Sequence, residues 1–180
     1  MPQTAFIRPL TLTDAALYRA FRLRALREHA DAFTSGFAEE SQKPIAYSEQ
    51  RIADSASSRL WGAFAGSDRK DMAGMVGLSL ETRRANRHKG HLVSMYVAPE
   101  FSGKGLGRTL VDTVLVEARQ LGLERLVLTV TDGNQSALAL YTRAGFTAFG
   151  TEPDAIRVNG RSFGKTHMSL FLDKQRSRTS

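Results

Sequence analysis

The chain has 180 residues, the size of one ordinary domain with a buried core. No apolar run approaches the length needed to cross a membrane, and the N-terminus lacks the features of a signal peptide. The absence of cysteine excludes disulfides, a cysteine nucleophile and thiolate metal sites, and it favours a cytoplasmic protein. The formal net charge of +7 would suit nucleic acid, an acidic membrane or a polyanionic small molecule.

Two runs carry much of this positive charge, residues 83–89 and the last seven residues, 174–180. Neither run has interleaved aromatic residues or a nucleic-acid-binding motif, so we expect neither nucleic acid nor a membrane as partner. We expect residues 1–173 to form a single domain and residues 174–180 to be a basic, disordered tail.

The first half of the chain predicts one strand, two helices and then three strands. Residues 4–10 are rich in strand formers. Residues 15–28 are rich in Ala, Leu and Arg, which favour a helix, and Ser48 is expected to cap a second helix that ends at Ser55. Three strands are then expected, over residues 60–65, 72–82 and 91–97.

The second half predicts a helix, a strand, a helix and a hairpin. Apolar residues recur at helical spacing over residues 107–121, and residues 125–131 form a continuous apolar run typical of a buried strand. A helix begins at Asn134 or Ser136, and Val-Asn-Gly-Arg at residues 158–161 is a strong hairpin turn. The expected fold class is mixed α/β, with a twisted, mostly antiparallel sheet of about seven strands flanked by about four helices.

A glycine-rich turn joins the strand over residues 91–97 to the following helix. Gly103, Gly105 and Gly107 surround Lys104, and Arg108 lies just inside the helix. Free amide N–H groups and the helix dipole at such a turn bind phosphate. The glycines are spaced GxGxG, so the sequence supports neither the dinucleotide pattern GxGxxG nor the Walker pattern.

Two motifs resemble those of the GNAT family of N-acetyltransferases. The stretch SGKGLG, residues 102–107, resembles the family's Q/R-x-x-G-x-G/A, with Ser102 where the family usually has Gln or Arg. The stretch N-x-x-A-x-x-L-Y-x-x-x-G-F begins at Asn134 and ends at Phe146, as in the family. The two motifs occur in the right order on the expected elements, and the order of elements matches the family over nearly the whole chain.

This resemblance implies transfer of the acetyl group of acetyl-CoA to a primary amine, of either a small molecule or a peptide or protein, by direct attack in a ternary complex. Acetyl-CoA is then the co-substrate, Tyr141 is the general acid that protonates the departing thiolate, and Asn134 bonds the pantetheine arm. The family's central strand splays from its neighbour, which leaves backbone groups free for the cofactor. The implied cofactor-binding residues are Met95, Tyr96, Val97, Ser102, Gly103, Lys104, Gly105, Leu106, Gly107, Arg108, Asn134 and Tyr141.

The general base is open. An amine acceptor has a pKa near roughly 10 and must lose a proton before it attacks. His91 falls where part of the family has a catalytic glutamate, and histidine titrates near neutrality. Glu81 and Asp132 are alternative candidates for the general base, and ordered water could also accept the proton. The sequence is equally consistent with His91 being a partly exposed residue at the end of a strand, with no catalytic role.

The acceptor and the assembly are also open. Phe33, Phe37, Glu39 and Glu40 lie where family members shape the acceptor cleft, and carboxylates there would suit a cationic amine, whereas the basic run at residues 83–89 would suit an acidic one. No His, Asp and Glu cluster has metal-ligand spacing, so we expect no metal. The chain is expected to be a monomer or a homodimer. The alternative functions are a non-catalytic CoA-binding or sensor module and a nucleic-acid-binding protein.

Overall fold

A seven-stranded sheet forms the centre of the molecule in the computed structural model, which describes residues 5–66 and 70–172. The strand order is β1-β2-β3-β4-β5-β7-β6, and within the described residues β4 and β5 are the one parallel pair. This confirms the expected mixed, mostly antiparallel sheet. The strands are β1 Phe6–Pro9, β2 Ser58–Ala65, β3 Asp71–Leu80, β4 Lys89–Val97, β5 Arg125–Thr131, β6 Thr147–Val158 and β7 Arg161–Phe171.

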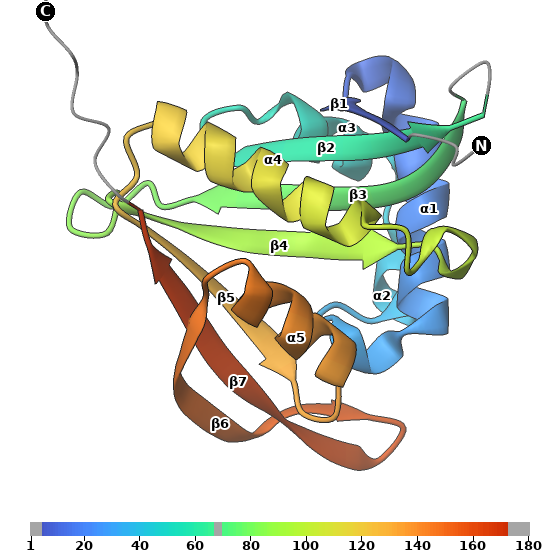
Figure 1. The fold of residues 1–180 in the computed structure, drawn as a ribbon. Helices are drawn as coiled ribbons and strands as arrows, with labels where there is room; N and C mark the ends of the chain where they lie inside the picture. Colours follow the sequence, from blue (N-terminus) through green and yellow to red (C-terminus); the bar gives the residue numbers. More distant parts are fainter. Residues whose placement is uncertain (1–4, 67–69, 173–180) are drawn as a thin grey trace, which may run out of the picture.

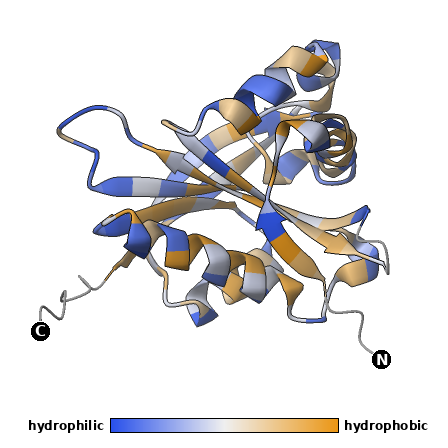
Figure 2. Cartoon of the chain, turned by 90° about the horizontal axis from the view of Figure 1, so that it is seen from above, coloured by the Kyte–Doolittle hydropathy of each residue, from blue (hydrophilic) through white to orange (hydrophobic). Residues whose placement is uncertain are grey.

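Helices cover both faces of the sheet (Figures 1 and 2). The α-helices are α1 Ala15–Glu28, α2 Phe37–Gln42, α3 Ile45–Ala53, α4 Leu106–Gln120 and α5 Gln135–Arg143. Short 3-10 turns precede α1, α2 and α4, and these are η1 Leu12–Asp14, η2 Ala30–Ala32 and η3 Pro99–Phe101, respectively. The expected tail at residues 174–180 lies outside the described residues.

The helices of the first half differ from the sequence-based expectation. The prediction that Ser48 caps the second helix is wrong: the N-cap of α3 is Pro44, four residues earlier, and Ser48 is buried inside the helix. Proline has a fixed φ that suits a helix start. The additional helix α2 lies in residues 29–47, a less regular stretch whose sequence suggests a short turn or helix.

Two hydrophobic clusters hold the layers together. The larger cluster joins α4 and α5 to the sheet through residues such as Leu110, Val114, Leu126 and Tyr141. The smaller cluster packs α1 onto β2, β3 and β4, and its members are Leu10, Tyr18, Phe21, Ala25, Leu60, Phe64, Met72, Met75, Tyr96 and Ala98. Among the described residues, no member of this second cluster comes from β5, β6 or β7.

Strands β4 and β5 pair only at their start. Their partners are Lys89 with Arg125, Gly90 with Leu126 and His91 with Val127, and no later pair exists within the described residues. The pairing of β4 with β3 shifts register between Met75 and Gly77, and Ser94 on β4 has φ of 55°, in the left-handed region. Such a bulge bends a strand. As a result, β4 and β5 diverge toward their C-terminal ends (Figure 1).

A buried carboxylate fixes the chain between β1 and α1. Arg8 donates to both oxygens of Asp14, at 2.7 and 2.8 Å, and the amide and hydroxyl of Thr11 each donate to Asp14 Oδ2 at 2.8 Å. The hydrogen bonds from Arg8 lower the pKa of the Asp14 carboxyl to about 2. The ionised form of Asp14 therefore stabilises the fold.

Replacing Asp14 with Asn is expected to lower the free energy of unfolding at pH 7 by about 1–2 kcal/mol. The pKa shift of Asp14 sets the upper end of this range. The expected loss is smaller because the Arg8 side chain is 34% exposed, and solvent screens its interaction with Asp14. Because the folded-state pKa is lowered, the stabilisation is complete above the ordinary value of 3.8 and is lost as the pH falls toward 2. Urea denaturation at pH 7 and pH 3 measures both effects.

Asp112→Asn is the matched control, because Asp112 forms an exposed pair with Arg108 on α4. We expect a change of less than about 0.5 kcal/mol for this variant. Equal losses in the two variants, or a loss for Asp14→Asn that does not shrink toward low pH, would contradict the assignment.

Candidate active site

A cleft of 1040 Å³ lies where β4 and β5 separate, and we call it the β4–β5 cleft. Its walls come from both sides of the sheet: from the glycine loop and α5 on one side, and from α1, α2, α3 and the segment after α1 on the other. A cleft of this size, with polar and apolar walls, is suited to a small-molecule ligand. The residues used below that line it are Arg22, Phe33, Thr34, Glu40, Arg51, Ser79, Ser94, Met95, Tyr96, Val97, Ser102, Gly103, Gly107, Asn134, Tyr141 and Lys165.

The C-terminal half of β4 forms one wall of the cleft. Met95, Tyr96 and Val97 all line it, beyond the last residue that pairs with β5. The edge of β4 that faces β5 therefore presents backbone N–H and C=O groups to the cleft instead of to a neighbouring strand. This is the splayed strand that the family resemblance implied.

The glycine loop brings a helix N-terminus to the same cleft. Gly103 and Gly107 line the cleft, and Gly105 is the N-cap of α4. Gly103 and Gly105 have φ of 74° and 82°, a left-handed conformation that glycine adopts without the steric cost of a Cβ. The first amides of α4 have no partner within the helix, so they can hold an anion.

The other side chains of the loop do not face the cleft. Lys104 donates to the carbonyl of Glu100 at 3.2 Å, and Arg108 bonds Asp112 at 2.9 Å and the carbonyl of Arg143 at 2.9 Å. Leu106 is buried in the core. The side chains of Lys104, Leu106 and Arg108 therefore do not line the cleft.

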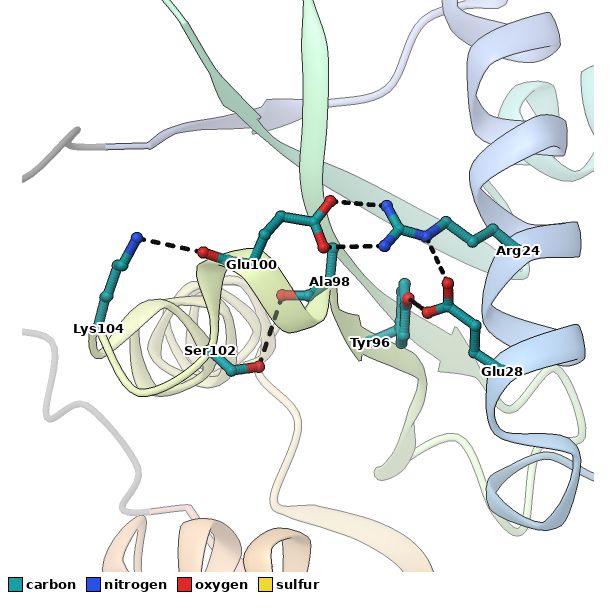
Figure 3. Close-up of polar contacts among 7 residues, drawn as sticks. All are labelled: Arg24, Glu28, Tyr96, Ala98, Glu100, Ser102 and Lys104. Atoms are coloured by element: carbon teal, nitrogen blue, oxygen red, sulfur yellow. Dashed lines mark hydrogen bonds and ion pairs between the residues drawn. The ribbon is translucent and has the colours of Figure 1, made fainter.

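A polar network ties α1 to β4 and to the start of the glycine loop (Figure 3). Arg24 donates to both oxygens of Glu100 at 2.8 Å and to Glu28 at 2.8 Å. The Tyr96 hydroxyl donates to Glu28 at 2.5 Å. The guanidinium of Arg24 lowers the pKa of Glu100 to about 2, so this ion pair persists throughout the neutral range. The network fixes η3, and with it the loop, relative to the strand that lines the cleft.

Tyr141 and Asn134 reach the cleft from α5. Tyr141 is buried, and this desolvation raises its pKa, so its hydroxyl stays protonated at neutral pH. Within the described residues the hydroxyl makes no hydrogen bond, while its ring packs edge-on against Phe146. Asn134 caps α5, because its Oδ1 accepts from the amide of Ala137 at 3.1 Å. This cap uses the carbonyl oxygen and not the amide nitrogen of the side chain.

None of the three candidate bases lines the cleft. His91 Nε2 lies 3.1 Å from Glu81 Oε1, so the structure brings these two residues together. His91 is the sheet partner of Ser79, which does line the cleft, and His91 therefore lies at its margin. Asp132 is exposed and accepts a hydrogen bond of 3.4 Å from Thr166.

The structure also brings to the cleft residues that the sequence analysis did not single out. Arg51 of α3 donates to Ser94 at 3.3 Å, across 43 positions of the chain. Lys165 of β7 donates to Thr34 at 2.7 Å, and burial lowers its pKa. No local motif marks these residues, because their proximity depends on how the helices pack on the sheet. Of the four residues expected to shape an acceptor cleft, Phe33 and Glu40 line it.

In residues 5–66 and 70–172, no group of three or more His, Asp and Glu side chains is arranged to hold a metal ion. No helix in these ranges combines the length and apolar character needed to cross a membrane.

Replacing Gly105 with Ala is expected to lower the free energy of unfolding by about 1 kcal/mol. A Cβ at Gly105 meets no atom within 4 Å, so the cost is the left-handed backbone and not a steric clash with a neighbour. Urea denaturation measures the change. The control is Gly150→Ala, since Gly150 is equally open but lacks a positive φ. Equal behaviour of the two variants would show that the loop relaxes freely.

Comparison with known proteins places this geometry in a family. A family model described as Acetyltransferase (GNAT) family matches residues 21–146. The L-methionine sulfoximine/L-methionine sulfone acetyltransferase of Pseudomonas aeruginosa is 37% identical over 84 residues, 47% of this chain and 49% of that protein. The aligned segments span about half or less of the length of the curated relatives that the chain matches.

Solved structures share the fold over nearly the whole chain. The acetyltransferase of GNAT family from Streptococcus pneumoniae matches with a TM-score of 0.83 and 25% identity, over 94% of this chain and 99% of that chain. A GNAT superfamily phosphinothricin acetyltransferase from Sinorhizobium meliloti, in complex with AcCoA, matches with a TM-score of 0.80 and 19% identity, over 95% and 90% of the two chains. With the family model, the splayed strands and the glycine loop in agreement, the chain belongs to the acetyltransferase (GNAT) family.

Proposed function

We propose that this protein is an N-acetyltransferase that uses acetyl-CoA and transfers the acetyl group directly to a primary amine in a ternary complex. The observation that carries the proposal is the β4–β5 cleft, which is bordered by the N-terminus of α4 and reached from both faces of the sheet. Such a cleft can admit a donor from one face and an acceptor from the other. Family membership supports the same activity.

The glycine loop is suited to the pyrophosphate of acetyl-CoA. Left-handed Gly103 and Gly105 let the backbone approach a phosphate closely, and the dipole of α4 favours negative charge. Ser102 in place of the family's usual Gln or Arg removes a longer side chain but leaves the backbone amides in place. The amides therefore carry most of the proposed contact.

The free edge of β4 is suited to the pantetheine arm and the acetyl carbonyl. Backbone groups of Met95, Tyr96 and Val97 would hydrogen-bond the arm, as a neighbouring strand would. One of these N–H groups would polarise the thioester carbonyl, because a preorganised donor stabilises the negative charge that develops on the oxygen. Asn134, whose Oδ1 caps α5, would add a contact through its amide nitrogen.

Acetyl-CoA supplies an activated thioester. The amine nitrogen attacks its carbonyl carbon, a C–N bond forms and the C–S bond breaks. Tyr141 would donate its proton to the departing thiolate, since burial keeps its hydroxyl protonated at neutral pH. The amine also loses a proton. His91, paired with Glu81 at the margin of the cleft, would accept that proton through water rather than by direct contact.

Calorimetric titration should detect acetyl-CoA binding, and Gly105→Glu is expected to weaken it at least about 10-fold. The new carboxylate would repel the pyrophosphate and would require a left-handed backbone at a non-glycine residue. Dephospho-CoA keeps the pyrophosphate and should still bind. Gly150→Glu, on the exposed strand β6, is the control. The absence of binding at millimolar acetyl-CoA would refute the proposal.

Replacing Tyr141 with Phe should lower kcat by about 10²- to 10⁴-fold and change the affinity for acetyl-CoA by less than about 3-fold. The reason is that only the proton donor is removed, while the buried ring remains. Steady-state kinetics with a panel of amines and calorimetry measure the two effects. Tyr18→Phe is the control, because Tyr18 is buried outside the cleft lining. A protein that binds acetyl-CoA but acetylates no amine would instead be the non-catalytic binding module.

A further inference from the structure

Arg51 is a charged residue of the cleft whose guanidinium makes few hydrogen bonds. It lines the cleft from α3, and its Nη2 donates to Ser94 at 3.3 Å. Its Nη1 lies 3.9 Å from Glu40 Oε1, beyond hydrogen-bonding distance. A guanidinium has five N–H donors, and within the described residues Arg51 uses one of them, for the hydrogen bond to Ser94.

The neighbouring carboxylate is shared with a second guanidinium, so it does not fully neutralise Arg51. Glu40 is buried and accepts from Arg22, at 3.1 Å from Nε and 3.4 Å from Nη2. Arg22 is also buried, so this pair forms a compensated unit in the wall of the cleft. Two guanidinium groups thus share one carboxylate, and Arg51 supplies the excess positive charge. Glu40 was expected to suit a cationic acceptor, but its pairing with Arg22 removes that preference.

The other charged groups of the cleft are less suited to bind an anion. The ammonium of Lys165 donates one hydrogen bond to Thr34, and burial lowers the pKa of Lys165, so its charge is less available than that of a guanidinium. The side chains of Asp31 and Asp54 are exposed to solvent, and Asp54 accepts from Ser57. Arg22 Nη1 and Tyr18 Oη are buried without a hydrogen-bond partner among the described residues, and both residues border a separate cavity of 10 Å³, about the space of one water. Arg22 also lines the cleft, but its charge is paired with Glu40.

The location of Arg51 relates this charge to the proposed chemistry. Ser94 is the left-handed residue of the β4 bulge and directly precedes Met95–Val97, where the thioester carbonyl would lie. The amine that attacks this carbonyl must approach the same point of β4. In an α-amino acid the carboxylate is separated from the amine by a single carbon, so it would come within reach of the unused donors of Arg51.

We propose that Arg51 binds the carboxylate of the acceptor, and that the acceptors of this protein are α-amino acids. The inference rests on the proposed function and narrows its acceptor class. The guanidinium fork matches a carboxylate in a bidentate arrangement, and Ser94 holds the fork toward the bulge. Arg51 is therefore a specificity-determining residue.

The test compares L-amino acids with the matching amines that lack the carboxylate, such as L-methionine and 3-(methylthio)propylamine, across a panel of side chains. The wild-type protein should have a higher kcat/KM for the amino acid of at least one pair. Arg51→Gln should lower that kcat/KM by about 10- to 100-fold, as expected for losing hydrogen bonds to a charged group. The same variant should lower the kcat/KM for the matching amine by less than about 3-fold, because the amine has no carboxylate to lose. Arg51→Lys should restore part of the loss, because it keeps the charge without the fork.

Two controls separate this proposal from the proposed function. Arg84→Gln removes an exposed positive charge outside the cleft lining and should preserve the preference for the amino acid. Calorimetry of the amino acids and amines with the CoA-loaded protein gives a readout that needs no turnover.

Acetylation of amines without any preference for a carboxylate, or a preference that survives Arg51→Gln, would overturn the role of Arg51 and leave the proposed function intact. Acetylation of no acceptor in the panel, together with equal calorimetric binding of amino acids and amines, would overturn both.

Discussion

The separation of two adjacent strands is the constraint on which the site depends. A sheet normally satisfies the backbone groups of a central strand on both edges, and unpaired groups in a buried position are costly. Here β4 pairs with β5 only as far as His91, and the left-handed residue Ser94 bends β4 away from β5. The unpaired backbone groups on this edge of β4 therefore face a cleft, where a ligand or solvent can hydrogen-bond to them.

The rest of the architecture keeps this opening in place. On one side α4 starts at left-handed Gly105, and Arg24 of α1 holds Glu100 just before the glycine loop. On the other side Arg22 and Glu40 form a buried pair that supports the wall carrying Arg51. A helix N-terminus, a free strand edge and a positive charge thus lie around one cleft, although they come from distant parts of the chain.

Much of the fold was predictable from local patterns. Apolar spacing located α4 and α5, the continuous apolar run located β5, and the glycine loop with the motif from Asn134 to Phe146 identified the family. Long-range geometry was not predictable in the same way. The start of α3 depends on Pro44 rather than on the polar Ser48, and the contact of Arg51 with Ser94 spans 43 positions without a motif. The family position of His91 did not reveal that this residue lies at the margin of the cleft, since that depends on how far β4 has diverged from β5.

The two hydrophobic clusters give the molecule an asymmetry with a mechanical consequence. The larger cluster contains residues from both halves of the sheet, so on the side of α4 and α5 the halves are joined by apolar packing. The smaller cluster contains none from β5, β6 or β7 among the described residues, and on that side the halves meet through hydrogen bonds such as Thr131 to the carbonyl of Asp31 and Lys165 to Thr34. Hydrogen bonds of this kind exchange with water at little net cost, whereas apolar packing does not. Separating the halves on the hydrogen-bonded side would therefore cost less free energy than separating them on the packed side, where apolar surface would become exposed to water.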